Sequence, residues 1–281
     1  MTASGGRLSV AVEGAPGTGH LVFRRVGPRT CLERARFHSP ARVLTPGNHG
    51  HAAWAYVTTL GGGLVDGDAV SLHIEVAPAA TAYVSTQGAT RVFRGAQGCT
   101  SDIHAQVAEG GLLFYLPEPL TLFEQARLTQ RIDLELAAGA SAVWLDVLSA
   151  GRVARGERWA FSALRSTLRV HVNGRLLVEE CTQLAAAPHA ALAERMGRFD
   201  AYATLLVLGP RVAELAAALQ TRIAAERMIR KAALVASVST LPGGVLLRAA
   251  AISTERLLTS LHRAIGPLGS LLGDDPLARR S

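Results

Sequence analysis

The feature that most constrains the fold is a strand–turn–strand pattern in residues 60–95 (LGGGLVDGDAVSLHIEVAPAATAYVSTQGATRVFRG). Apolar and polar residues alternate over residues 70–76, the chain turns at residues 77–79 (APA), and the alternation returns over residues 81–85. A period of two residues is typical of a strand that buries one face, and proline between two such runs indicates a turn. The stretch therefore predicts two short strands joined by a tight turn.

This pattern returns further along the chain. Residues 74–84 (IEVAPAATAYV) align with residues 134–144 (LELAAGASAVW), and residues 107–115 (VAEGGLLFY) fit the same frame between them. After one inserted residue, RVFRG at residues 91–95 aligns with RVARG at residues 152–156. The spacing is about 30 residues per unit, and such a unit cannot bury its apolar face unless several units stack. We therefore expect a mainly β, coiled, β-helix-like layered body; a plain β-meander is the alternative.

Two helices are predicted after the strands. Pro210 suits the first position of a helix, and the residues that follow place Leu215 and Leu219 on one apolar face. A second helix begins after Ser253 or Thr254, either of which can cap it, and ends before the glycine and proline at residues 266–267. The predicted organisation is a flexible start (1–19), one domain (20–265) with a β body (20–208) and helices at about 210–228 and 253–265, and a flexible tail (266–281).

The composition limits the class of protein. Hydrophobic residues make up 49% and charged residues 18% of the chain, which suits a folded core. Apolar runs are too short to span a bilayer, and the first ten residues lack the basic and apolar regions of a leader, so we expect a cytoplasmic protein with no membrane partner. The three cysteines are far apart without a CxxC pair, which argues against disulfides and structural zinc.

The charge does not indicate a nucleic-acid partner. The net charge is +7, but Lys231 is the only lysine among 29 basic residues, which points to compositional bias toward arginine. Aromatic residues make up only 5%, and none alternate with arginine as stacking platforms do. We therefore expect no nucleic-acid binding, although a positive face for an acidic protein stays possible.

Carboxylates in glycine- and proline-containing loops are the main candidates for a site. They are Asp66 and Asp68 after three glycines, Glu118 between two prolines, and Glu157 in a Gly/Arg loop. Oxygen ligands of this kind can pass a divalent cation along without holding it tightly, because strong retention of nickel or zinc usually draws on imidazole or thiolate. For Glu118 and the nearby Glu124, the alternative is that they are ordinary surface caps.

Other candidate motifs are weaker. The histidines at positions 49 and 51 could form a metal pair, but a solvated loop is the favoured interpretation. The glycine loop before Asp66 lacks the GxxxxGK[ST] pattern of a phosphate loop, and no catalytic motif is recognisable. An enzyme alternative would be a glycosidase-like pair formed by Glu118 and Glu124, whose separation the sequence does not give.

Five segments resemble one family. In order along the chain they are GGGLVDGD, VAPAATAYVSTQGATRVFRG, YLPEPLTLFEQA, GRVARGERW and FDAYATLLVLGP. Over roughly residues 21 to 265 the sequence is similar to the urease accessory protein family UreD, also called UreH. This resemblance implies a β-rich coiled fold with two helices and a role without catalysis.

The resemblance also implies partners and a cargo. Members of the family bind urease apoprotein and a UreF-type helical partner that recruits the GTPase UreG, and a water-filled passage is proposed to bring nickel to the buried urease centre. By position, Asp68 matches a family aspartate, Ser85, Thr86 and Gln87 match its Thr-Gln segment, and Glu118 and Glu157 match its loop carboxylates. The resemblance implies that these six residues line the passage for nickel. Asp68, Glu118 and Glu157 would then contact nickel transiently, and no cofactor would be tightly bound.

A second interpretation shares the fold but not the metal. The chain could be a UreD-like β-solenoid binding scaffold through which no nickel passes. That interpretation predicts no nickel dependence and no helical UreF-like partner.

Overall fold

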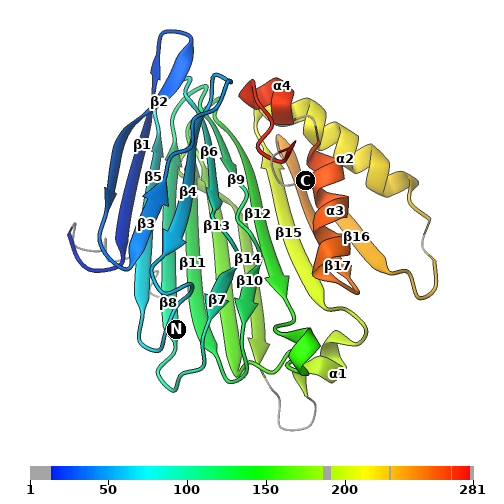
Figure 1. The fold of residues 1–281 in the computed structure, drawn as a ribbon. Coiled ribbons are helices and arrows are strands. Elements are labelled where there is room, and N and C mark those ends of the chain that lie inside the picture. The colour runs from blue at the N-terminus through cyan, green and yellow to red at the C-terminus, as the bar shows by residue number, and fades with distance from the viewer. Residues whose placement is uncertain (1–13, 186–190, 228, 267, 279–281) are drawn as a thin grey trace, which may run out of the picture.

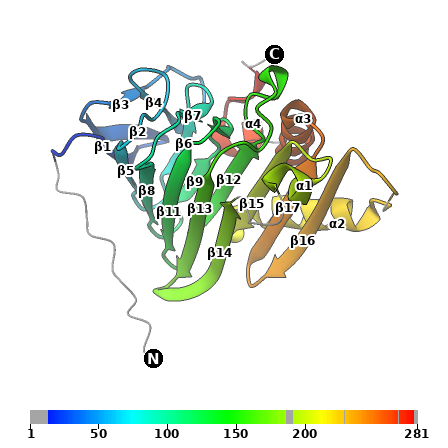
Figure 2. The ribbon, with the colours of Figure 1, turned by 90° about the horizontal axis from the view of Figure 1, so that it is seen from below.

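The computed structural model places most of the chain in two facing β-sheets, with helices packed against one of them (Figures 1 and 2). It describes residues 14–185, 191–227, 229–266 and 268–278. The fold is thus mainly β with two longer helices near the C-terminus, as the sequence predicts. None of the helices in these ranges is long and apolar enough to cross a membrane.

Seven strands form the first sheet, called sheet A. In spatial order they are β14 (Arg175–Ala185), β13 (Ala163–Val172), β11 (Arg127–Leu136), β8 (Cys99–Val107), β5 (Ala69–Val76), β1 (Thr18–Val26) and β2 (Arg29–Phe37). The five strands from β13 to β1 run parallel to one another, and the two edge strands are antiparallel to their neighbours.

Ten strands form the second sheet, called sheet B. The main path is β16 (Leu234–Leu241), β17 (Gly244–Ala251), β15 (Ala201–Leu208), β12 (Ser141–Ser149), β9 (Leu112–Tyr115), β6 (Thr81–Thr86), β4 (Ala53–Thr59) and β3 (Ala41–Leu44). The short strands β7 (Thr90–Val92) and β10 (Leu120–Leu122) pair with each other, and β10 also pairs with β12.

Two of the helices, α2 (Ala213–Ala225) and α3 (Thr254–Ile265), are longer than the others. The short ones are the 3-10 turns η1 (Val153–Arg155) and η2 (Pro210–Val212) and the α-helices α1 (Leu192–Met196) and α4 (Leu268–Leu272). The predicted helices correspond to α2 and α3, and Ser253 caps α3 by accepting a hydrogen bond from the Arg256 N–H at 3.2 Å. Both helices contact β15 and β17, so they cover the face of sheet B that points away from sheet A (Figure 2).

The strand register confirms the main repeat. The chain alternates between the sheets, from β5 to β6, from β8 to β9 and from β11 to β12. Ala105 pairs with both Ile74 and Leu134, and Tyr115 pairs with both Val84 and Trp144. Residues 74–84 and 134–144 are therefore equivalent positions in two units that flank a middle unit, as the alignment predicts.

Other parts of the repeat prediction differ from the structure. The coiled, β-helix-like body is not confirmed, because the sheets do not close and each keeps free edge strands, β14 and β2 in one and β16 and β3 in the other. The alignment of residues 91–95 with 152–156 also fails. Thr121 pairs with Arg91 on one side and with Ser149 on the other, so the structural equivalent of Arg91 is Ser149 and not Arg152. The reason is that β12 continues three residues past the point where the alignment requires a turn.

Buried apolar side chains form three clusters. The first fills the space between the sheets, the second lies between sheet B and the helices, and the third lies at the end where β7 and β10 pair. Leu257, Leu261 and Ile265 of α3 belong to the second cluster and are at most 3% exposed. The apolar helix face predicted from the sequence is thus the face that packs on sheet B.

The ends of the chain differ from the simplest expectation. Residues 1–13 lie outside the described residues, and β1 already begins at Thr18. In the tail, Leu268 and Leu272 of α4 are fully buried in the second cluster, and the Leu272 carbonyl accepts hydrogen bonds from the His51 and Ala52 N–H groups at 3.2 Å. Two leucines one helical turn apart give this segment a surface to pack, which the glycine and proline before it do not reveal.

The packing of α3 leads to a stability prediction. Leu257→Ala removes a fully buried side chain and leaves a cavity, so it should lower the free energy of unfolding by about 2 to 5 kcal/mol. Thr259→Ala on the exposed side of the same helix should change it by no more than about 0.5 kcal/mol. Urea denaturation of both variants checks this, and equal midpoints would contradict the assigned packing.

Candidate functional site

Polar side chains interrupt the apolar core at one level of the space between the sheets. In sheet A, Ser101, Gln130 and Ser166 are paired in register on β8, β11 and β13. Gln130 follows the inward alternation of β11, between the buried side chains of Leu128 and Ile132, and it is 8% exposed. The three polar side chains therefore form a row that faces sheet B.

Sheet B supplies a matching row. Asp146 of β12 pairs in register with Thr204 of β15. Thr86 ends β6 two residues after Val84, as Asp146 follows Trp144 by two, so both lie at the same level of the sheet. We call these residues the polar belt: Thr86, Ser101, Gln130, Asp146, Ser166 and Thr204.

Hydrogen bonds join the two rows across the gap. The Gln130 side-chain nitrogen donates to the Asp146 carboxylate at 3.1 Å and to the Ser166 hydroxyl at 3.2 Å. Buried polar groups of this kind are stable only when they are paired or hydrated. Asp146 also keeps a partly accessible surface although its neighbours in β12 are buried.

A cavity of about 370 Å³, partly open to the outside, lies beside the belt. Its lining includes Thr86, Gln87, Ser101 and Gln130, together with apolar residues of both sheets. Gln130 thus belongs both to the cavity and to the hydrogen bonds of Asp146. A space of this size, lined in part by polar groups, has room for several water molecules. The belt is therefore connected to solvent beside the turn that follows β6.

An ion pair crosses between the sheets at the other end. Arg248 of β17, which pairs with Thr204, donates through Nε to Oε1 of Glu180 on β14 at 2.9 Å. Hydrogen bonding to Glu180 raises the pKa of Arg248, so the guanidinium stays charged. The row of polar side chains consequently extends from the cavity to β14, at the edge of sheet A, and to β17, next to the edge of sheet B.

The electrostatics of the belt centre on Asp146. Burial raises the pKa of Asp146 to about 6, and the hydrogen bonds from Gln130 and Ser166 act in the opposite direction. Burial, followed by the nearby Asp146 charge, also raises the pKa of Tyr115. At neutral pH the belt therefore carries a carboxylate charge next to neutral hydroxyl and amide groups, which is an attractive environment for a cation.

The raised pKa of Asp146 has a consequence for stability. Its folded-state pKa of about 6 exceeds the ordinary 3.8, so folding favours the protonated form; this contribution is complete at low pH and is lost as the pH rises through 6. Asp146→Asn cannot ionise, so its stability relative to wild type should increase by up to about 3 kcal/mol between pH 4 and pH 7.5. Thermal unfolding at both pH values checks this, and a difference that does not depend on pH would contradict it.

The structure places three of the predicted site residues close to one another. Thr86 and Gln87 line the cavity. Ser85 is fully buried but points to the opposite face of sheet B, where its hydroxyl donates to the Leu116 carbonyl at 2.7 Å. The backbone N–H of Glu118 donates to the Thr86 hydroxyl at 2.9 Å, so the Glu118 backbone lies beside a residue that lines the cavity.

The aspartates of the GGGLVDGD segment hold turns. The Asp68 carboxylate accepts the Val65 N–H at 2.8 Å and closes its own loop. Asp66 accepts the backbone N–H groups of three residues in the neighbouring turn, Ala96, Gln97 and Gly98. A side chain on Gly95 would collide with Asp66, at 2.0 Å from its Oδ1, which explains the glycine there. These contacts give the two aspartates a structural role at the start of β5.

Glu157 is held in a different loop. Its carboxylate accepts a hydrogen bond from Arg152 Nε at 2.8 Å and one from the Glu124 N–H at 3.3 Å. Hydrogen bonding from Arg152 lowers the pKa of Glu157, and Arg152 also lies over the Phe123 ring at 4.1 Å. Asp68 and Glu157 therefore belong to two separate loop networks.

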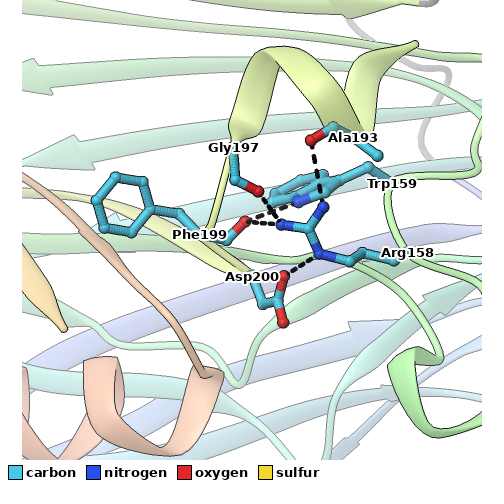
Figure 3. A network of polar contacts seen from close by, with 6 residues as sticks. All are labelled: Arg158, Trp159, Ala193, Gly197, Phe199 and Asp200. Carbon is cyan, nitrogen blue, oxygen red and sulfur yellow. Dashed lines mark hydrogen bonds and ion pairs between the residues drawn. The ribbon is translucent and has the colours of Figure 1, made fainter. Parts of the chain in front are cut away.

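The same loop contains a clamp built on Arg158 (Figure 3). Its guanidinium pairs with Asp200 and donates to the backbone carbonyls of three residues around α1, Ala193, Gly197 and Phe199. The neighbouring Trp159 ring N–H donates to the Phe199 carbonyl at 2.8 Å. Together they fix the loop after β12 to the segment that enters β15, so the GRVARGERW segment positions two strands of the belt.

Removing the clamp should destabilise the protein. Arg158→Ala removes the guanidinium donor from Asp200 and from the Ala193 and Gly197 carbonyls, which should cost about 2 to 3 kcal/mol of unfolding free energy. Arg155→Ala, at an exposed position of η1, is the matched control and should change stability by less than about 0.5 kcal/mol. Chemical denaturation of both variants measures these changes, and equal losses of unfolding free energy would contradict the role of the clamp.

Apart from Thr86, the belt residues were not among the sequence-based predictions. Gln130, Asp146 and Ser166 each appear as one polar residue at the inward phase of an otherwise apolar strand. That isolated interruption, repeated on three strands, is the signal that could have identified them. Within the part of the chain that the structure describes, no three His, Cys, Asp or Glu side chains converge to hold a metal ion, and the histidines at 49 and 51 are no exception.

Comparisons with known proteins agree on one family. The model of a family described as UreD urease accessory protein matches residues 15–281. A protein named urease accessory protein UreD from Sorangium cellulosum (strain So ce56) is 48% identical over 95% of this chain and 85% of its own length. One of the same name from Anaeromyxobacter sp. (strain Fw109-5) is 38% identical over 94% of this chain and 89% of its own. Urease accessory protein D from Arabidopsis thaliana is 27% identical over 93% and 99%.

Proposed function

The chain belongs to the UreD family of urease accessory proteins, and from that premise we propose that it assists urease maturation by letting nickel pass between its two sheets. Nickel is cargo in this proposal, not a resident cofactor. The observation that supports it is the polar belt, which crosses an interface that is otherwise filled by apolar side chains.

The chemistry of the belt suits passage better than storage. An ion in an apolar interior loses its hydration without compensation, at a cost of many kcal/mol. Hydroxyl and amide oxygens of Thr86, Gln130 and Ser166, with water from the cavity, can replace part of that hydration. Because the belt offers one carboxylate and neither thiolate nor imidazole, it should attract Ni²⁺ without retaining it.

The loop carboxylates have different places in this proposal. Glu118 is the one next to the cavity, because its N–H binds Thr86, so we propose it as the contact at the entrance. Asp68 and Glu157 hold turns, and nickel contact by either one stays a prediction. Replacing Glu118 should therefore lower nickel transfer.

The partners follow from the family rather than from the geometry. We propose that the chain binds urease apoprotein and a UreF-type accessory protein, which brings the GTPase UreG, and that this assembly works in the cytoplasm. No reaction is assigned to the chain itself. The relatives are named accessory proteins, which supports an assisting role in urease maturation.

A variant that makes the belt apolar tests transit. In Gln130→Leu/Asp146→Leu both partners of the cross-sheet hydrogen bond are removed together, a change that is often nearly neutral for folding. The ion would then lose its polar path. Because each 1.4 kcal/mol of barrier is tenfold in rate, nickel loading of co-expressed urease should fall by at least about tenfold.

The control for this experiment lies on the other side of β11. Arg131→Leu changes the next residue, which faces away from the belt, and should leave loading near the wild-type level. Nickel per urease active site and urease activity are measured for all three proteins, with binding to apo-urease checked by co-purification. Full loading by a folded, urease-bound double variant would contradict transit and favour a scaffold through which no metal passes.

A further inference from the structure

The edge strands of the two sheets differ in how well they are protected against pairing with another chain. A free edge presents unpaired N–H and C=O groups, and proteins usually protect it with charged residues, a bulge or a short strand. Strand β2 has four charged residues and an irregular register, β14 has three and an irregular register, and β3 is only four residues long. Strand β16 (LVASVSTL) has eight residues without a charge, and its register with β17 is unbroken.

The hydrogen bonds to β17 show which groups of β16 point outward. Ala233 and Ile252 continue the β16–β17 register by one pair, and the Ile252 N–H donates to the Ala233 carbonyl at 2.9 Å. Because bonded and non-bonded pairs alternate along an antiparallel ladder, the odd-numbered residues of β16 bond to β17. The outward N–H and C=O groups therefore belong to Leu234, Ala236, Val238 and Thr240. Among the described residues, no other strand pairs with this edge and no loop backbone bonds to it.

The layers on either side of β16 leave this edge open. Helix α2 contacts β15, β16 and β17, so it lies over three strands and not beyond the last one. On the other face, Glu180 of β14 bonds Arg248 of β17, which places the edge of sheet A opposite β17 and not opposite β16. Strand β16 thus forms the outer margin of sheet B (Figures 1 and 2).

An apolar margin follows the same edge. Leu234, Ala236 and Val238 of β16 pack on the cluster between sheet B and the helices, and so does Ile223 of α2. All four side chains are only half-buried, because they lie where that cluster ends. An occupant that continues sheet B would satisfy the outward backbone groups and cover these side chains at the same time.

We propose that β16 pairs with β16 of a second copy of this chain, antiparallel about a twofold axis at Ser237. In this register Leu234 of one copy faces Thr240 of the other. Ala236 likewise faces Val238, so every outward N–H and C=O group of the strand finds a partner in the other copy. The facing side chains are small or apolar and uncharged, so none of them repel.

Charge favours this edge for contact between two copies. The net charge of the chain is +7, so two copies repel wherever basic residues meet. Strand β16 is uncharged, and the basic residues of the loop before it are Arg227, Arg230 and Lys231. Because the paired strands run in opposite directions, these two loops lie at opposite ends of the interface, each toward the uncharged turn that follows Leu241 in the other copy. The inference does not depend on whether nickel passes through the interior.

The oligomeric state of the tag-free chain tests the inference. Light scattering during size-exclusion chromatography, over a range of protein concentrations, should show a dimer that dissociates on dilution. Ala236→Pro removes an outward N–H and no bond to β17, so the dimer dissociation constant should rise by at least about tenfold. Ala236→Ser keeps the N–H at the same position and should dimerise as wild type does. Circular dichroism establishes that each variant is folded.

A cross-link tests the register. In a Cys31→Ser/Cys181→Ser background, which removes the two exposed cysteines, Ser237→Cys puts two thiols opposite each other across the axis. The Cα atoms of such a non-bonded pair are about 4.5 Å apart, within reach of a disulfide. Ser239→Cys on the same face lies away from the axis and should stay unlinked. A chain that stays monomeric, whatever other protein its edge binds, or equal cross-linking at both positions, would overturn the inference.

Discussion

The in-register stacking of parallel strands is the constraint on which the rest of the structure depends. When each unit of the chain repeats the level of the one before, side chains at equivalent positions line up across the sheet. Most inward levels are apolar and form the core. At one level the aligned residues are polar, and the hydrogen bond from Gln130 to Asp146 connects the two sheets there. An isolated Asp146 would be costly, but a row of partners stabilises it.

The two faces of sheet A use the same register for different chemistry. On the inside, Ser101, Gln130 and Ser166 offer oxygen and amide groups that interact weakly with a metal ion. On the outside, His20, His73 and His104 are register partners in one row. The proposed passage of a metal ion between the sheets needs no reactive group, which suits an accessory protein.

Much of the fold could be predicted from the sequence. The alternation in residues 70–76, the equivalence of residues 74–84 and 134–144, and both longer helices were predicted because they are local patterns. The belt could not be predicted in this way, because which strands face one another depends on how two open sheets pack. Loop carboxylates stand out in a sequence, yet Asp68 and Glu157 bind their own loops. The separation of His73 and His104 equals one repeat, so the repeat frame places them side by side without showing which face they occupy.

The most direct test of a metal path between the sheets is an anomalous-scattering map at the nickel absorption edge, recorded from crystals of this protein soaked in a nickel salt. The account predicts anomalous density inside the molecule, bordered by Asp146, Gln130 and the cavity that Thr86 lines. An interior without nickel or ordered water at that level, in crystals whose surface sites are occupied, would contradict it.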